Sequence, residues 1–373
     1  MINTMILKPS HRCNFNCSYC YDRFDRSKNF HIMPMEECIK VLKMAYNENP
    51  RMEIIWHGGE PLLLGKDYLD TVMSTFPKDS FFWSIQTNGS LIDDEWVEIF
   101  KKHNVHVGIS WDGVLHNETR NKLDIKKVYD LFKKHEAEMP GFLMTYTPQN
   151  APSILQTYID YNLYFKDAGG FGLNTLFGEK ISDEEYDIMA FYLLQLFDYI
   201  CTQKDAKIIR PYEDILNFFS GRRLRLCEFI TCANRWVGIS PQGDVIPCGK
   251  PWGEEYVFGN ILEENQTFEN IFKTEKYQKF AYECIHSWDS CRGCKYLMGC
   301  NGGCFHKGMD RNLKYTKDEG YCKYRYTLFE GAKEIIKNRC NTNTLVNEEI
   351  ILYLNSSFKG EFAQWRNYKS PII

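Results

Sequence analysis

The chain has 373 residues, 44% of them hydrophobic and 15% aromatic, enough to build one large domain with a buried core and a smaller second one. A net charge of −4 and a pI near 6.2 exclude a basic surface for nucleic acid, so we expect no nucleic-acid partner. No apolar run approaches the length of a membrane span, and the first twelve residues lack a signal-peptide core, which predicts a cytoplasmic protein with no membrane partner.

The fifteen cysteines are unevenly distributed. Three lie together near the N-terminus, Cys38 and Cys201 are isolated, and ten fall between residues 227 and 340. In a reducing compartment such cysteines are more often metal ligands than disulfides. The distribution predicts a metal-rich module that follows a first, larger module.

The first cysteine group is Cys13, Cys17 and Cys20, which directly follow the short apolar stretch 5–7. Three thiolates from one tight loop can hold three irons of a 4Fe-4S cluster, and no fourth cysteine follows at ferredoxin spacing. The remaining iron could bind a substrate or cosubstrate, as the open position of a catalytic zinc does. The spacing therefore favours a catalytic cluster, with a zinc knuckle or a group of buried thiols as the alternative.

Over the first 180 residues, short apolar runs alternate with segments that carry apolar residues at helical spacing. The expected strands are 4–7, 53–56, 81–86, 106–111, 142–146 and 171–176. The expected helices are 35–48, 66–75, 93–103, 125–138 and 152–166. Repeated βα units imply parallel strands with helical crossovers, closed as a barrel or open as a doubly wound sheet. Six units are too few for a complete eight-stranded barrel.

Glycine-containing motifs follow three of these strands: His57-Gly58-Gly59-Glu60-Pro61, Gln86-Thr87-Asn88-Gly89 and Ser110-Trp111-Asp112-Gly113. Paired glycines let a backbone approach a ligand closely, and a glutamate beside them can accept hydrogen bonds from an ammonium group. Each motif could instead be an ordinary turn between a strand and a helix.

The CxxxCxxC loop with Tyr19 before its last cysteine, followed by these three motifs in order, resembles the radical S-adenosylmethionine (AdoMet) enzymes. The resemblance implies an α/β fold, a partial (β/α)6 TIM-type barrel with its site at the carboxyl ends of the strands. It implies that a 4Fe-4S cluster on Cys13, Cys17 and Cys20 binds AdoMet and cleaves it to a 5′-deoxyadenosyl radical, which abstracts hydrogen. The AdoMet contacts that it implies are Tyr19, Gly58, Gly59, Glu60, Pro61, Asn88 and Ser110.

Asp112 and Arg120 also resemble a pair in peptide-modifying members of that family. An arginine there could bind a substrate carboxylate or backbone in a bidentate manner. A solvated surface ion pair is the simpler interpretation, and we prefer it at this stage.

A long helix is expected over 182–202, followed by a bridge over 210–225 into the cysteine-rich module. That module contains Cys227-x4-Cys232-x15-Cys248, then Cys291-x2-Cys294-x5-Cys300-x3-Cys304, then Cys322. A hairpin is expected between 236–239 and 245–247. Eight cysteines make two sets of four, and their spacing alone leaves two structural zinc sites open.

This pattern resembles the SPASM domain, which implies two auxiliary 4Fe-4S clusters and therefore three clusters in all. The implied ligands are Cys227, Cys232, Cys248 and Cys304 for the first cluster, and Cys291, Cys294, Cys300 and Cys322 for the second. Fully ligated clusters suit electron transfer or structural support. Cys284 and Cys340 are unassigned. The expected domains are 1–225 (radical AdoMet barrel), 226–325 (SPASM domain) and 326–373 (C-terminal helix and aromatic tail, interpreted as a packing segment).

SPASM members mostly oxidise or cross-link peptides. The layout is similar to the formylglycine-forming sulfatase maturases, but those enzymes carry an aspartate, their base, directly after the cysteine matching Cys248, where this chain has Gly249. His57 likewise replaces a glutamine before the GGEP motif. The HGGEPLLLG stretch is more similar to enzymes that form cyclophane links in short peptides.

We therefore expect an oxidoreductase that cross-links a ribosomally made peptide, with a peptide or protein substrate and a reducing partner such as flavodoxin or ferredoxin. The alternatives are an anaerobic sulfatase-maturating enzyme, dehydrogenation of a small carbohydrate, and a non-catalytic iron-sulfur electron-transfer module. His57, Asp112 and Glu60 lie near the expected site, but none of them is identified as the catalytic base.

Overall fold

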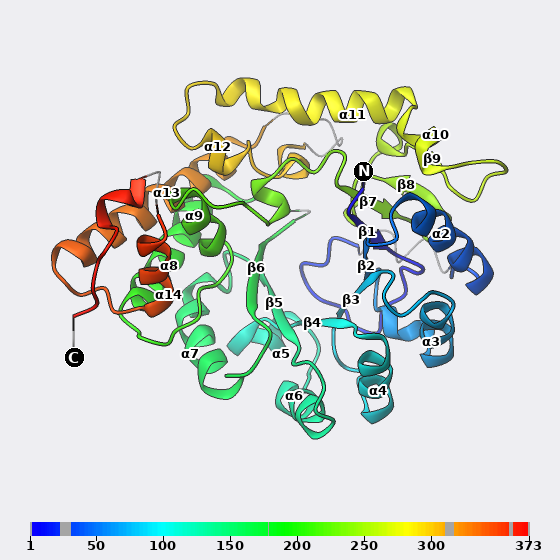
Figure 1. Cartoon of the computed structure of the whole chain (residues 1–373), viewed down its shortest axis with the longest axis horizontal. Helices are drawn as coiled ribbons and strands as arrows, with labels where there is room; N and C mark the ends of the chain where they lie inside the picture. Colours follow the sequence, from blue (N-terminus) through cyan, green and yellow to red (C-terminus); the bar gives the residue numbers. More distant parts are fainter. Residues whose placement is uncertain (1, 23–30, 178, 310–316, 358–360, 372–373) are drawn as a thin grey trace.

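A computed structural model describes residues 2–22, 31–177, 179–309, 317–357 and 361–371 (Figure 1). Its strands are β1 (Thr4–Leu7), β2 (Glu53–Trp56), β3 (Phe82–Thr87), β4 (His106–Ser110), β5 (Gly141–Tyr146), β6 (Phe171–Thr175), β7 (Trp236–Ile239), β8 (Asp244–Ile246) and β9 (Gly259–Asn260). The helices around the first six strands are α2 (Met35–Glu48), α3 (Lys66–Ser74), α4 (Asp94–His103), α5 (His116–Thr119), α6 (Ile125–Lys134), α7 (Ile154–Tyr164) and α8 (Asp183–Cys201). Those of the second half are α9 (Tyr212–Phe219), α10 (Phe268–Phe272), α11 (Glu275–His286), α12 (Leu297–Cys300), α13 (Glu319–Asn341) and α14 (Glu348–Asn355).

Strands β1 to β6 pair in chain order and all in parallel, each joined to the next by a helical crossover, which confirms the expected partial barrel. In Figure 1 their helices form an outer layer around the curved sheet. The carboxyl ends of the six strands therefore meet at one mouth, where a barrel of this type places its site.

The cysteine-rich half is joined to the barrel through the sheet. Strand β7 pairs in parallel with the free side of β1, with Leu7 opposite Ile239, and continues through the antiparallel strands β8 and β9. The expected hairpin is present as β7 and β8. The cysteine loop that follows β1 and Cys248, which lies two residues after the antiparallel strand β8, line the same cavity.

The local sequence explains why these elements form. In β2, Ile54 and Trp56 are buried while Glu53 and Ile55 are only partly buried, the period-two pattern of a strand with one buried face. Helix α4 begins where the Asp93 carboxylate accepts from the backbone of Trp96. Helix α8 begins with a capping box in which Ser182 and Glu185 each accept from the other's backbone N–H.

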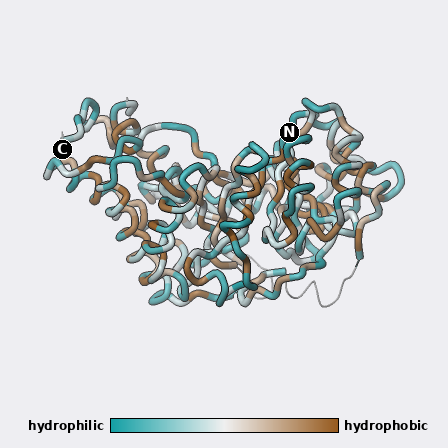
Figure 2. Tube along the Cα trace, turned by 90° about the horizontal axis from the view of Figure 1, so that it is seen from below, coloured by the Kyte–Doolittle hydropathy of each residue, from teal (hydrophilic) through white to brown (hydrophobic). Residues whose placement is uncertain are grey.

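The C-terminal part packs on the outside of the barrel. Helix α13 lies along α8 in Figure 1 and extends across the expected boundary at residue 325. In the tail, Phe362 is fully buried and its ring lies 5.0 Å from that of Phe219, as a packing segment requires. Figure 2 shows hydrophilic segments on much of the outside of the trace. Within the described residues, no helix combines the length and apolarity that crossing a bilayer requires.

Candidate active site

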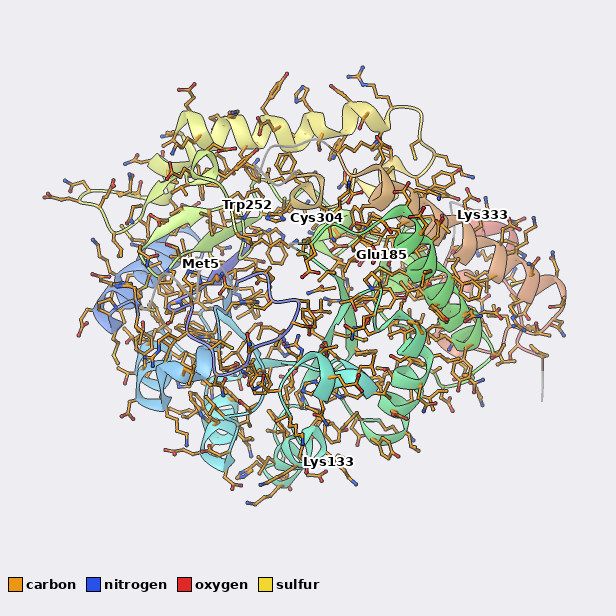
Figure 3. All side chains as sticks on the ribbon, turned by 180° about the vertical axis from the view of Figure 1, so that it is seen from behind. Met5, Lys133, Glu185, Trp252, Cys304 and Lys333 are labelled. Atoms are coloured by element: carbon orange, nitrogen blue, oxygen red, sulfur yellow. The ribbon has the colours of Figure 1, made fainter. Side chains whose placement is uncertain are left out.

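A cavity of about 310 Å³ lies at the mouth of the barrel. It is lined from the barrel side by Cys13, Cys17 and Cys20, and from the other half by Cys227, Cys232, Cys248 and Cys304. Figure 3 shows Cys304 and Trp252 toward the middle of the molecule, whereas Lys133 and Lys333 lie at its periphery. The fold therefore brings two of the three predicted cluster sites to one cavity.

The paired glycines of the GGEP motif position the first cysteine loop. A Cβ on Gly58, whose φ is +130°, would lie 2.2 Å from the carbonyl oxygen of Ser10, and one on Gly59 would lie 2.1 Å from that of Arg12. The backbone N–H of Glu60 also donates to the carbonyl of Arg12 at 2.7 Å. Both glycines line the cavity, but their close approach is to the chain just before Cys13.

Glu60 holds two strand ends together. Its buried carboxylate accepts from the backbone of Leu62 at 3.1 Å, the Thr87 hydroxyl at 2.7 Å and the backbone of Asn88 at 2.7 Å. Neither Glu60 nor Pro61, which is also buried, is among the residues that line the cavity. Contact between the Glu60 carboxylate and the ammonium group of AdoMet stays a prediction, while the structure gives this side chain an internal set of donors.

Three further predicted AdoMet contacts do line the cavity. The Asn88 amide donates to Asn14 Oδ1 at 2.8 Å, next to the first cysteine. Ser110 accepts from the Gln86 amide at 2.9 Å, and the Tyr19 hydroxyl donates to the Asp112 carboxylate. Tyr19, Asn88 and Ser110 therefore line the same cavity as the cysteine loop, and their contact with AdoMet stays a prediction.

The interpretation of Asp112 and Arg120 as a solvated surface pair is wrong. Arg120 Nε donates to Asp112 Oδ2 at 3.0 Å, and the two side chains are only 10% and 0% exposed. Arg120 Nη1 also lies 3.7 Å from Cys17 Sγ. Asp112 lies in the turn after β4, and Arg120 follows helix α5, so that both lie over the strand end and the ion pair is buried against the cysteine loop. The sequence alone does not show this position.

Each auxiliary cysteine set has a basic side chain beside one of its sulfur atoms. Lys250 Nζ lies 3.2 Å from Cys304 Sγ in the first set, and Arg325 Nε lies 3.1 Å from Cys300 Sγ in the second. The second set, Cys291, Cys294, Cys300 and Cys322, lines a separate cavity of about 90 Å³, which Cys304 of the first set also borders. The unassigned Cys284 is buried beside Cys232, with which it shares a hydrogen bond.

The donor chemistry fits the implied cofactors. Three thiols from one loop and two sets of four thiols are the ligands that 4Fe-4S clusters take, and the barrel-side set opens into a cavity lined by polar strand-end residues where AdoMet would bind. Among the described residues, no three His, Cys, Asp or Glu side chains lie close enough together to hold a single metal ion.

A buried charged group that the sequence did not predict lies beside the same cavity. Lys8 Nζ donates to Asp22 Oδ1 at 2.8 Å and to the carbonyl of Gly249 at 3.1 Å, and His11 Nδ1 lies 3.0 Å from Asp22 Oδ2. Burial opposes ionisation of Asp22, but the hydrogen bond with His11 and the charge of Lys8 hold its pKa well below the usual value. Burial and Lys8 lower the pKa of His57 to about 4, so its imidazole is neutral at physiological pH.

Gly249 stands where the resemblance implies an aspartate, and a side chain there would clash with Ile6. A Cβ on Gly249 would lie 2.7 Å from Ile6 Cγ2, on the inner face of β1. Ile6 is β-branched, so this methyl can move away only if the whole side chain rotates about its Cα–Cβ bond, a rotation with few favourable positions. The packing of Ile6 in β1 therefore disfavours any side chain, including a carboxylate, at position 249.

This packing predicts that Gly249→Ala lowers the free energy of unfolding by about 1–3 kcal/mol through overpacking. Gly141→Ala is the matched control, since its Cβ would meet nothing closer than 3.6 Å. Denaturant titrations of both variants measure the difference. In an Ile6→Ala background, which removes the clashing methyl, the effect of Gly249→Ala should disappear; an unchanged effect there would contradict the steric explanation.

The partial barrel brings three cysteines of one loop and four cysteines of the second module to one mouth. This arrangement is that of iron-sulfur proteins with a catalytic cluster at the strand ends. The comparisons agree with this class. The model of the radical SAM superfamily matches residues 7–148, and that of the SPASM iron-sulfur cluster-binding domain matches residues 227–295. The chain belongs to the radical SAM superfamily and carries a SPASM domain, as predicted.

Three relatives illustrate the range of similar proteins. The cysteine-type anaerobic sulfatase-maturating enzyme of Clostridium novyi is 26% identical over 88% of this chain and 94% of its own. The serine-type enzyme of Bacteroides thetaiotaomicron is 25% identical over 85% and 86%. The radical SAM cyclopropyl synthase TigE of Paramaledivibacter caminithermalis is 23% identical over 90% and 75%.

Two solved structures share the fold. Native anSMEcpe with bound AdoMet and Cp18Cys peptide has a TM-score of 0.74 at 24% identity, over 92% of this chain and all of that one. Streptococcus suis SuiB bound to the precursor peptide SuiA has a TM-score of 0.62 at 18% identity, over 86% and 75%. At these identities the likeness establishes the arrangement of barrel and SPASM domain.

Proposed function

We propose that this protein is a radical AdoMet maturase that oxidises a residue of a peptide or protein bound in the cavity at the barrel mouth. The observation that carries the proposal is that one cavity is lined by both the barrel cysteines and the first auxiliary set. A residue held there would lie between the predicted AdoMet site and a predicted electron acceptor. The similarity to peptide-bound SPASM structures supports a peptide substrate.

The proposed ligands are Cys13, Cys17 and Cys20 for the AdoMet-binding cluster, and the two sets of four cysteines named above for two auxiliary clusters. When bound, these groups would supply AdoMet cleavage and electron acceptance. The chain's own residues fix the geometry of the site. Gly58 and Gly59 allow the backbone before the cysteine loop to approach closely, and Asn88 and Tyr19 link the loop to the strand ends by hydrogen bonds. A reducing partner such as flavodoxin or ferredoxin, and a cytoplasmic location, belong to the proposal.

Two reactions are candidates for the oxidation. The comparisons favour formylglycine formation, because cysteine-type and serine-type sulfatase-maturating enzymes are among the relatives that match over most of the chain. Peptide cross-linking, the reaction that the sequence predicted, has less support from these relatives. One observation keeps it as the second candidate: the position of the implied base is Gly249, and Ile6 fills the space beside it.

The test is anaerobic incubation of the iron-loaded protein with AdoMet, a reductant and a peptide that contains one cysteine, or its serine counterpart. Formylglycine formation replaces hydrogen sulfide by oxygen at the cysteine, or removes two hydrogens at the serine, and the product reacts with a hydrazine. A cross-link removes two hydrogens, suppresses fragmentation between two residues and gives no hydrazine product.

Co-expression with short open reading frames beside the gene extends the search to natural peptides. We expect 5′-deoxyadenosine to form together with the modified peptide. If AdoMet is not cleaved under any of these conditions, the protein is an electron-transfer module and the proposal is wrong.

A further inference from the structure

Lys250 is held between a predicted cluster ligand and an aromatic ring. Its Nζ lies 3.2 Å from Cys304 Sγ and 3.4 Å from the centroid of the Phe177 ring. The ammonium group lines the cavity at the barrel mouth. A lysine in contact with a ring face and a sulfur atom is oriented by both, because the ring attracts the cation and the sulfur accepts its hydrogen.

The groups around Lys250 leave its positive charge facing the cysteines of the first auxiliary set. The neighbouring position, Gly249, carries no side chain, and one added there would clash with Ile6. The carboxylate that acts on the charge of Lys250 is that of Glu228, and its effect is smaller than those of Cys304, Cys248 and Cys227. The carbonyl of Gly249 is already used by Lys8. A second buried cation, Lys307, also lies over the Phe177 ring, at 4.7 Å, but its Nζ donates to the carbonyl of Leu176. Lys250 is thus the cation whose hydrogen bond reaches a predicted ligand of the first auxiliary cluster.

We propose that Lys250 sets the reduction potential of the first auxiliary cluster by a charged N–H···S hydrogen bond to Cys304. Reduction of this cluster adds one electron and one negative charge and takes up no proton. A fixed positive charge at a ligand sulfur stabilises the more negative, reduced form, and hydrogen bonds to cluster sulfurs are a recognised means of adjusting potential. Lys250 is a positioning and tuning residue, and it makes the cluster that faces the cavity a better electron acceptor.

The second auxiliary site offers an internal comparison. Arg325 Nε makes the equivalent contact there, to Cys300 Sγ at 3.1 Å, and its guanidinium also donates to the carbonyl of Glu228 at 3.0 Å. This arginine belongs to α13, whereas Lys250 lies two residues after Cys248, in the segment that follows β8. A change at Lys250 should therefore alter one auxiliary cluster and leave the other unchanged.

The inference rests on the proposed assignment of Cys227, Cys232, Cys248 and Cys304 to one cluster. The experiment is a potentiometric titration of the full iron-loaded protein, followed by electron paramagnetic resonance, for wild type and for Lys250→Met and Lys250→Arg. The AdoMet-binding cluster is recognised because its signal changes when AdoMet is added. Iron content is measured for every sample.

We expect Lys250→Met to disfavour reduction of one AdoMet-insensitive cluster by about tenfold, which is about 59 mV for one electron, and to leave the other at its wild-type potential. Lys250→Arg should keep most of the wild-type value, because it retains the charge. No shift in Lys250→Met at full iron content overturns the inference, as does an equal shift of both clusters.

The remaining outcomes are also decisive. If Lys250→Met and a second neutral variant, Lys250→Gln, both lose about four irons while Lys250→Arg keeps them, Lys250 is needed to hold the cluster and the tuning role is wrong. If the wild type itself binds no auxiliary clusters, the proposed cluster assignment has failed. A normal set of clusters with an unshifted potential overturns the role of Lys250 alone.

Discussion

Replacement of Cys13, Cys17 and Cys20 by alanine is expected to abolish AdoMet cleavage completely and to remove about four irons per chain, the content of one 4Fe-4S cluster. The three thiols come from one loop at the barrel mouth, and the described part of the chain places no other cysteine on that side of the cavity. The auxiliary sets lie on other segments and should keep their iron. Detection of 5′-deoxyadenosine and iron analysis under anaerobic conditions measure both effects.

Cys38 and Cys340 provide matched controls for that experiment. Cys38 is buried in α2, within the same half of the molecule, and Cys340 lies in α13; neither lines the cavity. Alanine at either position should leave cleavage near the wild-type rate. Cleavage that survives in the triple variant, or that is lost equally in the controls, would contradict the assignment of the catalytic cluster.

Most of the barrel could be predicted because its elements are local. Strands β1 and β2 have the predicted bounds, as does α2, since each is a short apolar run or an amphipathic segment with clear ends. The pairing of β7 with β1 could not be predicted, because the partners are about 230 residues apart and nothing in either strand specifies the other. That pairing is what places the auxiliary cysteines at the barrel mouth.

The candidate site was predictable to the extent that motifs describe it. Gly58, Gly59, Asn88, Ser110 and Tyr19 were identified by order and spacing, and all five line the cavity. The roles of their neighbours were not predictable. Whether a carboxylate faces a ligand or the protein depends on donors from other strands, as the internal hydrogen bonds of Glu60 show.

The base candidates show the same dependence on tertiary contacts. Asp112 accepts from Tyr19, Thr119 and Arg120, and Glu60 accepts from three donors of its own. The Nδ1 atom of His57 accepts from the backbone of Gly58 at 2.8 Å. Each of these three side chains thus has a hydrogen-bond partner within the protein, and the sequence alone could not have shown this.

Arg120→Met is expected to lower the free energy of unfolding by about 3–5 kcal/mol, because it leaves the buried carboxylate of Asp112 without its cation. Asp112 is fully buried and would retain only neutral donors, namely the hydroxyls of Tyr19 and Thr119 and the backbone N–H of Thr145. The double variant Arg120→Met/Asp112→Asn removes both charges and should be destabilised less than Arg120→Met alone. Denaturant titration of the iron-loaded protein under anaerobic conditions measures the three free energies.

The matched control is an exposed ion pair of the same chain. Lys273 and Glu269 are paired at 2.5 Å, but both side chains are about 70% exposed, so Lys273→Met should change stability by less than about 1 kcal/mol. If Arg120→Met has as small an effect as this control, the pair is solvated and its burial against the cysteine loop is wrong. If the double variant loses as much as Arg120→Met, the loss reflects the packing of the arginine, and charge compensation is not the cause, since the long side chain itself covers Tyr19.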